Sequence, residues 1–120
     1  MDYYDSEQLS ISNKSKSTIF SIISPNDNIA GSSFYSENAY HTFHFEPIKP
    51  NQKIENHDRP RDWKSYFEKI PDKKIRIFIV EQDSVVKYGW KKIFEKQLFS
   101  KKYMLLLSEL EKNHWEVQFK

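Results

Sequence analysis

Two histidines and a glutamate in the first half of the chain are of residue types that could bind a metal: His41, His44 and Glu46. The surrounding segment, residues 39–45, is rich in aromatic and β-branched residues, which favours a strand. Successive side chains of a strand point to opposite faces, so His41 and His44 would not reach one ion together. His44 and Glu46 would share a face, but two ligands are too few for a structural zinc site. We therefore expect no metal site.

A second polar segment, from His57 to Asp62, could support acid–base or phosphoryl chemistry. Histidine titrates near neutral pH, and arginine holds a phosphate group through two hydrogen bonds. Arg59 and Arg61 lie here, although only three of the 19 basic residues are arginines. Neither a nucleophile motif nor a glycine-rich phosphate loop accompanies them. We interpret the segment as a solvated loop. Contact of Arg59 and Arg61 with a partner or a phosphate group is one alternative, and catalysis by His57 is another.

Two carboxylates, Glu81 and Asp83, directly follow the most apolar segment of the chain. Carboxylates at the carboxyl end of a strand are where α/β folds place metal and substrate groups. The amino-acid sequence from Ile75 to Trp90 is similar to that of the first strand and first helix of a response-regulator receiver domain. A receiver also needs a phosphorylatable aspartate on a later strand, and no aspartate follows Asp83. We therefore exclude a functioning receiver and interpret Asp83 as a helix cap.

Six lysines of the last third could form a basic surface for nucleic acid: Lys87, Lys91, Lys92, Lys96, Lys101 and Lys102. Tyr88, Trp90 and Tyr103 would then offer rings on which bases stack. Against this, Glu95 lies among the lysines, and the net charge of the chain is only +2. Lysine stems beside an apolar stripe are also typical of a solvated amphipathic helix. A solvated face, nucleic acid and an acidic protein partner all stay open.

The elements that would position these residues belong to a short chain of 120 residues, enough for one ordinary domain. The absence of cysteine excludes a disulfide framework and a cysteine nucleophile. No apolar run approaches the roughly 18 residues of a membrane span, and the N-terminus lacks the order of a signal peptide. We therefore expect a cytoplasmic protein that does not bind membranes. Scarce alanine and glycine with abundant lysine indicate an AT-rich genome, viral or bacterial.

The predicted fold is a small single α+β domain with the order β-β-α-β-α-α-β, in which helices pack on one mixed or antiparallel sheet. The polar, serine-rich residues 1–16 predict a flexible arm, which leaves 17–120 as the domain. A loop with three prolines is expected at 47–61. Strands are predicted at 18–23, 39–45, 74–80 and 115–119, and helices at 61–70, 84–99 and 101–112.

The strand at 74–80 has apolar residues on both faces, with Ile75, Ile77 and Ile79 on one and Phe78 and Val80 on the other. A strand that is apolar on both faces is predicted to lie in the interior of its sheet.

The helix predicted at 101–112 is apolar on two sides. Tyr103, Leu106, Leu107 and Leu110 form one stripe, and Leu105 points almost opposite. Such a helix is either enclosed by the fold or covered by a partner.

No enzyme signature emerges, and we expect neither catalysis nor a cofactor. Aromatic residues make up 16% of the chain, and such residues are enriched in interfaces. We therefore expect a non-catalytic protein-interaction module, such as a small inhibitor, an immunity protein or an accessory factor; a phage or mobile-element antagonist of host defence fits this size. Its partner is another protein or a second copy of the chain. The expected contact residues are Leu105, Tyr103, Trp90, Arg59 and Arg61. The alternative is a nucleic-acid-binding module that uses the six lysines.

Overall fold

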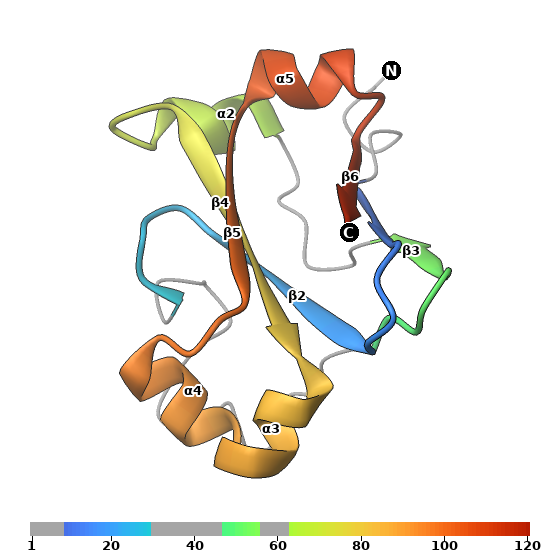
Figure 1. Ribbon diagram of the computed structural model, residues 1–120. Helices are drawn as coiled ribbons and strands as arrows, with labels where there is room; N and C mark the ends of the chain where they lie inside the picture. Colours follow the sequence, from blue (N-terminus) through green and yellow to red (C-terminus); the bar gives the residue numbers. More distant parts are fainter. Residues whose placement is uncertain (1–8, 30–46, 56–62) are drawn as a thin grey trace.

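The computed structural model describes residues 9–29, 47–55 and 63–120, which form six strands and four helices (Figure 1). The strands are β1 (Ser10–Asn13), β2 (Ile19–Ser24), β3 (Lys53–Glu55), β4 (Lys74–Glu81), β5 (Lys101–Leu106) and β6 (Glu116–Phe119). The helices are α2 (Trp63–Glu68), α3 (Gln82–Tyr88), α4 (Trp90–Lys96) and α5 (Leu107–Lys112). The predicted α+β class is confirmed. The described residues form more strands and helices than predicted, and the strand expected at 39–45 lies outside these residues.

The strands form two three-stranded sheets, where one sheet was predicted. In the first sheet the order is β3-β1-β6, with β1 antiparallel to β3 and parallel to β6. In the second sheet the order is β2-β4-β5, and both pairings are antiparallel. Since β5 and β6 each pair with one described strand, both lie at the edge of their sheet. Helix α5 crosses between these two edges and connects them along the chain (Figure 1).

On their other side the two sheets are joined by backbone hydrogen bonds. The amide of Ile19, at the start of β2, donates to the carbonyl of Ile48 over 3.0 Å, and the amide of Ile48 donates back over 2.7 Å. The buried side-chain amide of Asn13 also donates to the carbonyls of Ile48 (2.8 Å) and Ser17 (2.7 Å). The sheets therefore meet beside β2 and β3. No strand in the described part of the chain pairs with the outer edge of β5 or of β6, and we call these two edges open.

Strand β4 is the centre of the second sheet, as its two apolar faces predicted. Ile75, Ile77 and Ile79 are fully buried on one face, and Phe78 and Val80 are fully buried on the other. The isoleucine face lies in a first core cluster that includes Ile11 and Val117 of the first sheet, Trp63 and Phe67 of α2, and Leu110 of α5. The Phe78 face lies in a second cluster with Ile22, Ile29, Ile93 and Phe94. The prediction of an interior strand is confirmed.

The helix predicted at 101–112 is wrong, because residues 101–106 form β5 and only Leu107–Lys112 form α5. The apolar run from Tyr103 to Leu107 satisfies a helix or a strand equally well. The edge of β4 decides between them, since it pairs Ile77 with Tyr103 and Ile75 with Leu105. Such pairing overrides local propensity. In a strand Tyr103 and Leu105 share a face, so the predicted opposite orientation of Leu105 is also wrong.

The helix predicted at 84–99 is interrupted at Gly89, which separates α3 from α4. Gly89 has φ 82° and ψ 156°, a conformation that is essentially restricted to glycine. Helix α3 contributes no buried residue, whereas α4 buries Ile93 and Phe94. The cap also differs from the prediction: Glu81 occupies the N-cap position, and Asp83 lies in the first turn.

The arm predicted over 1–16 does not extend through residues 9–13. Leu9 and Ile11 are fully buried in the first core cluster, and β1 is the middle strand of its sheet. Leu9 and Ile11 alternate with polar residues as in a strand, but a segment of four residues is too short for this alternation to predict one. Residues 1–8 lie outside the described residues. The strand predicted at 115–119 is confirmed as β6, and Ile70 is buried just beyond α2.

Candidate functional site

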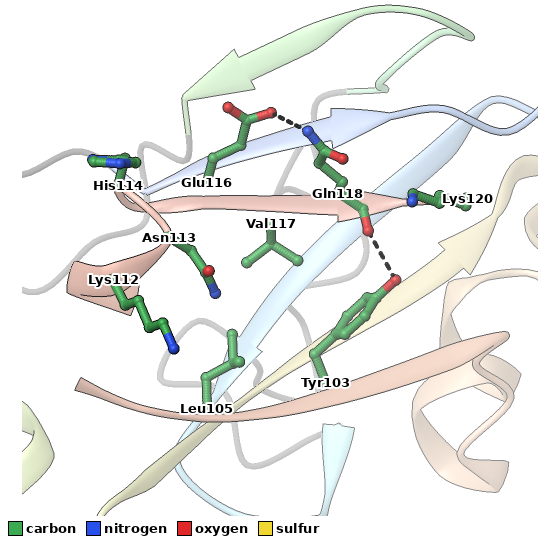
Figure 2. A pocket seen from close by; sticks show the side chains of 9 residues that line it. All are labelled: Tyr103, Leu105, Lys112, Asn113, His114, Glu116, Val117, Gln118 and Lys120. Carbon is green, nitrogen blue, oxygen red and sulfur yellow. Dashed lines mark hydrogen bonds between the residues drawn. The ribbon is translucent and has the colours of Figure 1, made fainter. Parts of the chain in front are cut away.

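A groove with a volume of about 630 Å³ lies between the open edges of β5 and β6 (Figure 2). We call it the edge groove. Its lining comes from β5, the end of α5 and β6, and consists of Tyr103, Leu105, Lys112, Asn113, His114, Glu116, Val117, Gln118 and Lys120. These segments are joined by a sharp turn, in which His114 (φ 57°) and Trp115 (φ 61°) have left-handed backbone conformations. The turn brings the chain from α5 back along the open edge of the first sheet.

The floor of the edge groove is apolar. Val117 is buried, and Leu105 is half-buried and packs against the same first core cluster. Figure 2 shows the two side chains extending toward one another from their strands. The floor is therefore continuous with the core of the protein.

One end of the edge groove is spanned by Tyr103. Its hydroxyl donates a hydrogen bond to the backbone carbonyl of Gln118 over 3.2 Å (Figure 2). Burial removes water from the phenol and raises the pKa of Tyr103 above its ordinary value of 10.0. The hydroxyl therefore stays protonated at neutral pH and acts as a hydrogen-bond donor.

The charged groups around the edge groove differ in whether another side chain of the described residues binds them. The Glu116 carboxylate accepts a hydrogen bond from the Gln118 side chain over 3.1 Å and lies 3.8 Å from the Lys53 ammonium. The Gln118 hydrogen bond is the main cause that lowers the pKa of Glu116. Lys112 and Lys120 are exposed and make no ion pair with any residue in the described ranges. Within the described ranges the groove thus offers two lysines without an ion-pair partner and one carboxylate that is already engaged.

The residues predicted from sequence to contact a partner are placed in three different settings. Tyr103 and Leu105 line the edge groove. Trp90 instead packs in the second core cluster, with its ring 5.1 Å from that of Phe20. Arg59 and Arg61 lie outside the described residues, as do His57, His41, His44 and Glu46.

The six lysines do not lie on consecutive helices as predicted, since Lys101 and Lys102 belong to β5. Lys87 and Lys92 both lie over the ring of Tyr88, at 5.1 and 5.8 Å from its centre. The Lys101 ammonium is 5.6 Å from the ring of Tyr103, whereas Lys102 forms an ion pair of 3.1 Å with Asp27. Lys91 and Lys96 are exposed on α4.

Sequence reasoning missed a buried charge, Arg76, on the Phe78 face of β4. Its side chain is only 7% exposed and forms ion pairs with Asp27 (2.8 Å) and Asp72 (2.7 Å). These hydrogen bonds lower the pKa values of both aspartates. The signal in the sequence was an arginine between two isoleucines of an apolar run, Ile75 to Val80. Because its donors are bonded to carboxylates and to the Lys74 carbonyl, Arg76 ties loops to the sheet and is not available for a ligand.

Sequence reasoning also missed the contribution of residues 112–120 to a site. The alternation from Trp115 to Phe119 predicted a strand, but it did not indicate that this strand would lie across a groove from β5.

Among the residues that the structure describes, no helix is long and apolar enough to cross a membrane. No protein-family model matches the chain, and no curated protein or solved structure is matched by it.

Proposed function

We propose that this protein is a non-catalytic module that binds a protein partner in the edge groove. The observation that carries the proposal is the position of the groove, between two sheet edges with which no other described strand pairs and above an apolar floor. An open edge presents unpaired amide and carbonyl groups, which other polypeptides use for pairing. Small inhibitors, immunity proteins and accessory factors act by such binding without chemistry of their own.

The side chains of the edge groove support binding more than catalysis. The nine lining residues include no serine, threonine or cysteine. The one hydroxyl, that of Tyr103, donates to a backbone carbonyl and has a raised pKa, so it is a poor nucleophile at neutral pH.

The test uses two neighbouring residues that face opposite sides of β5. Leu105 lies on the floor of the edge groove, and Met104, which is 39% exposed, points away from it. We expect Leu105→Gln to reduce capture of protein partners from a native lysate by about tenfold, as for an interface hot spot, whereas Met104→Gln leaves capture unchanged. Thermal unfolding of both variants checks that each is folded.

Capture that persists in Leu105→Gln at a normal melting temperature would contradict the proposal. Since Leu105 is half-buried and not on an exposed helix face, some loss of stability is expected in this variant. A second groove variant at an exposed position, Asn113→Glu, therefore repeats the measurement without disturbing the core.

Nucleic-acid binding is the second candidate, and one observation favours it. Tyr88 is 39% exposed with Lys87 and Lys92 over its ring, an arrangement that resembles a stacking platform beside phosphate-binding cations. This candidate predicts retention on a polyanion column that falls steeply with salt. It also predicts that Lys87→Glu with Lys92→Glu abolishes retention while the edge-groove variants do not.

A further inference from the structure

We propose that the occupant of the edge groove is an acidic peptide segment of another protein, which binds in extended form as an added strand along β6. The inference rests on the proposed function, because it names the class of partner for the same groove.

The backbone of β6 presents hydrogen-bonding groups to the edge groove. The carbonyls of Trp115 and Phe119 accept hydrogen bonds from Ser10 and Lys14 at the two ends of β1, over 2.8 and 2.6 Å. Backbone groups alternate in direction along a strand, so those of Gln118 point away from β1. The hydrogen bond from Tyr103 to the Gln118 carbonyl comes from the groove side and agrees with this alternation. By the same alternation the Glu116 carbonyl also points away from β1, so a peptide along this edge would pair with that carbonyl and with the amide of Gln118, whose own carbonyl already accepts the Tyr103 hydroxyl.

The two edges are too far apart to pair with one another. Paired strands lie about 4.8 Å apart. Between β5 and β6 the distance is bridged by the side chain of Tyr103 together with a hydrogen bond of 3.2 Å. The edges therefore leave room for another chain beside Tyr103, over Leu105 and Val117 (Figure 2). Alternate side chains of an added strand would rest on this apolar floor, and the intervening ones would face solvent.

The charge of the edge groove selects an acidic peptide. Lys112, at the end of α5, and Lys120, beyond β6, extend from opposite ends of the groove (Figure 2). Neither has an ion-pair partner within the described ranges, whereas Glu116 is already bonded to Gln118 and lies near Lys53. Complementary charge steers association and fixes the register of a partner. A nucleic acid would need stacking rings, whereas the lining contains no tryptophan or phenylalanine, and its one tyrosine, Tyr103, is held by the hydrogen bond of its hydroxyl to Gln118.

The experiment selects binders from a random peptide library displayed on phage, with the full chain as the target. The selected peptides are then synthesised with a fluorescent label, and their binding is measured by anisotropy. We expect sequences in which apolar residues alternate with aspartate or glutamate. Methylation of the peptide backbone nitrogens that face β6 is expected to weaken binding by about tenfold, because strand addition requires those donors. Methylation at the alternate positions that face away should have a smaller effect.

Charge reversal at the edge groove tests the role of the two lysines. The double variant Lys112→Glu with Lys120→Glu is expected to weaken the acidic peptides by about tenfold and to favour peptides in which lysine replaces the acids. The matched control is Lys91→Glu with Lys96→Glu, which makes the same charge change on exposed residues of α4 and should leave affinity nearly unchanged.

The outcomes separate failure of the inference from failure of the proposed function. Affinity that is insensitive to backbone methylation would overturn strand addition, and affinity that is insensitive to the Lys112/Lys120 reversal would overturn the acidic character of the partner; protein binding would stand in both cases. A selection that yields no groove-dependent peptide also overturns the inference. If a single-stranded oligonucleotide binds in a Lys87- and Lys92-dependent way and no peptide or protein binds, the proposed function fails as well.

Discussion

The hydroxyl of Tyr103 on β5 donates a hydrogen bond to the backbone carbonyl of Gln118 on β6, and this contact joins the open edges of two different sheets. The contact lies at one end of the edge groove. Tyr103→Phe removes the hydrogen bond and retains the ring. We expect a loss of about 0.5–1.5 kcal/mol in the free energy of unfolding, measured by urea denaturation.

The control for this prediction is Tyr88→Phe, since Tyr88 is an exposed tyrosine of α3 with the ammonium groups of Lys87 and Lys92 over its ring. Its free energy of unfolding should change by less than about 0.5 kcal/mol. Equal losses in the two variants would mean that the Tyr103 hydrogen bond does not contribute to the junction between the sheets.

Ile77 lies at the centre of β4, fully buried on the face that packs against the first sheet and against α2 and α5. Ile77→Ala leaves a cavity in the first core cluster, and we expect it to lower the free energy of unfolding by about 2–5 kcal/mol. Val86→Ala is the comparison, because Val86 is 81% exposed and its truncation should cost less than about 0.5 kcal/mol. A small loss at Ile77 would show that β4 is not the core strand.

The ion pairs of Arg76 predict a dependence of stability on acid. The pKa values of Asp27 and Asp72 are lowered below 3.8, chiefly by hydrogen bonds from Arg76. A lowered pKa in the folded state stabilises the protein above the ordinary pKa, and this contribution is lost as the pH falls through the lowered values. The urea concentration at the midpoint of unfolding should therefore decrease as the pH is lowered from neutral to below 3.8.

The variant that isolates this effect is Arg76→Met, which removes the cation and keeps an apolar side chain of similar length in the buried position. Its stability at neutral pH should be lower, and its further decline in acid should be shallower than that of the parent. Parallel pH profiles for the two proteins would show that Asp27 and Asp72 gain nothing from Arg76 in the folded state.

The break between α3 and α4 depends on the backbone of Gly89. Outside the adjoining backbone, no described residue has a heavy atom within 4 Å of the position that a Gly89 Cβ would occupy, so the cost of a methyl group there is backbone strain. We expect Gly89→Ala to lower the free energy of unfolding by about 1–3 kcal/mol. Incorporation of D-alanine by chemical synthesis should restore most of this loss, since a D-residue tolerates φ 82°. An unchanged stability in Gly89→Ala would mean that the helices rejoin when glycine is absent.

The sequence by itself determined the elements whose apolar residues recur with a single spacing, either that of a strand or that of a helix. The alternation of Ile75, Ile77 and Ile79 against Phe78 and Val80 indicated an interior strand, and β4 is the middle strand of its sheet. Trp115 to Phe119 predicted the last strand for the same reason. The apolar spacing of Trp63, Phe67 and Ile70 indicated a helix that buries one stripe, as α2 and the turn beyond it do.

Tertiary structure decided the segments whose sequence fits two periods or is too short to show one. The run from Tyr103 to Leu107 became a strand because the edge of β4 offered it a ladder of hydrogen bonds, and β1 was recognisable only once Leu9 and Ile11 entered the core. The edge groove depends on the same cause. Periodicity describes how a segment buries its own side chains, whereas the approach of β5 to β6 depends on pairing between residues far apart in the chain. No local pattern encodes that pairing.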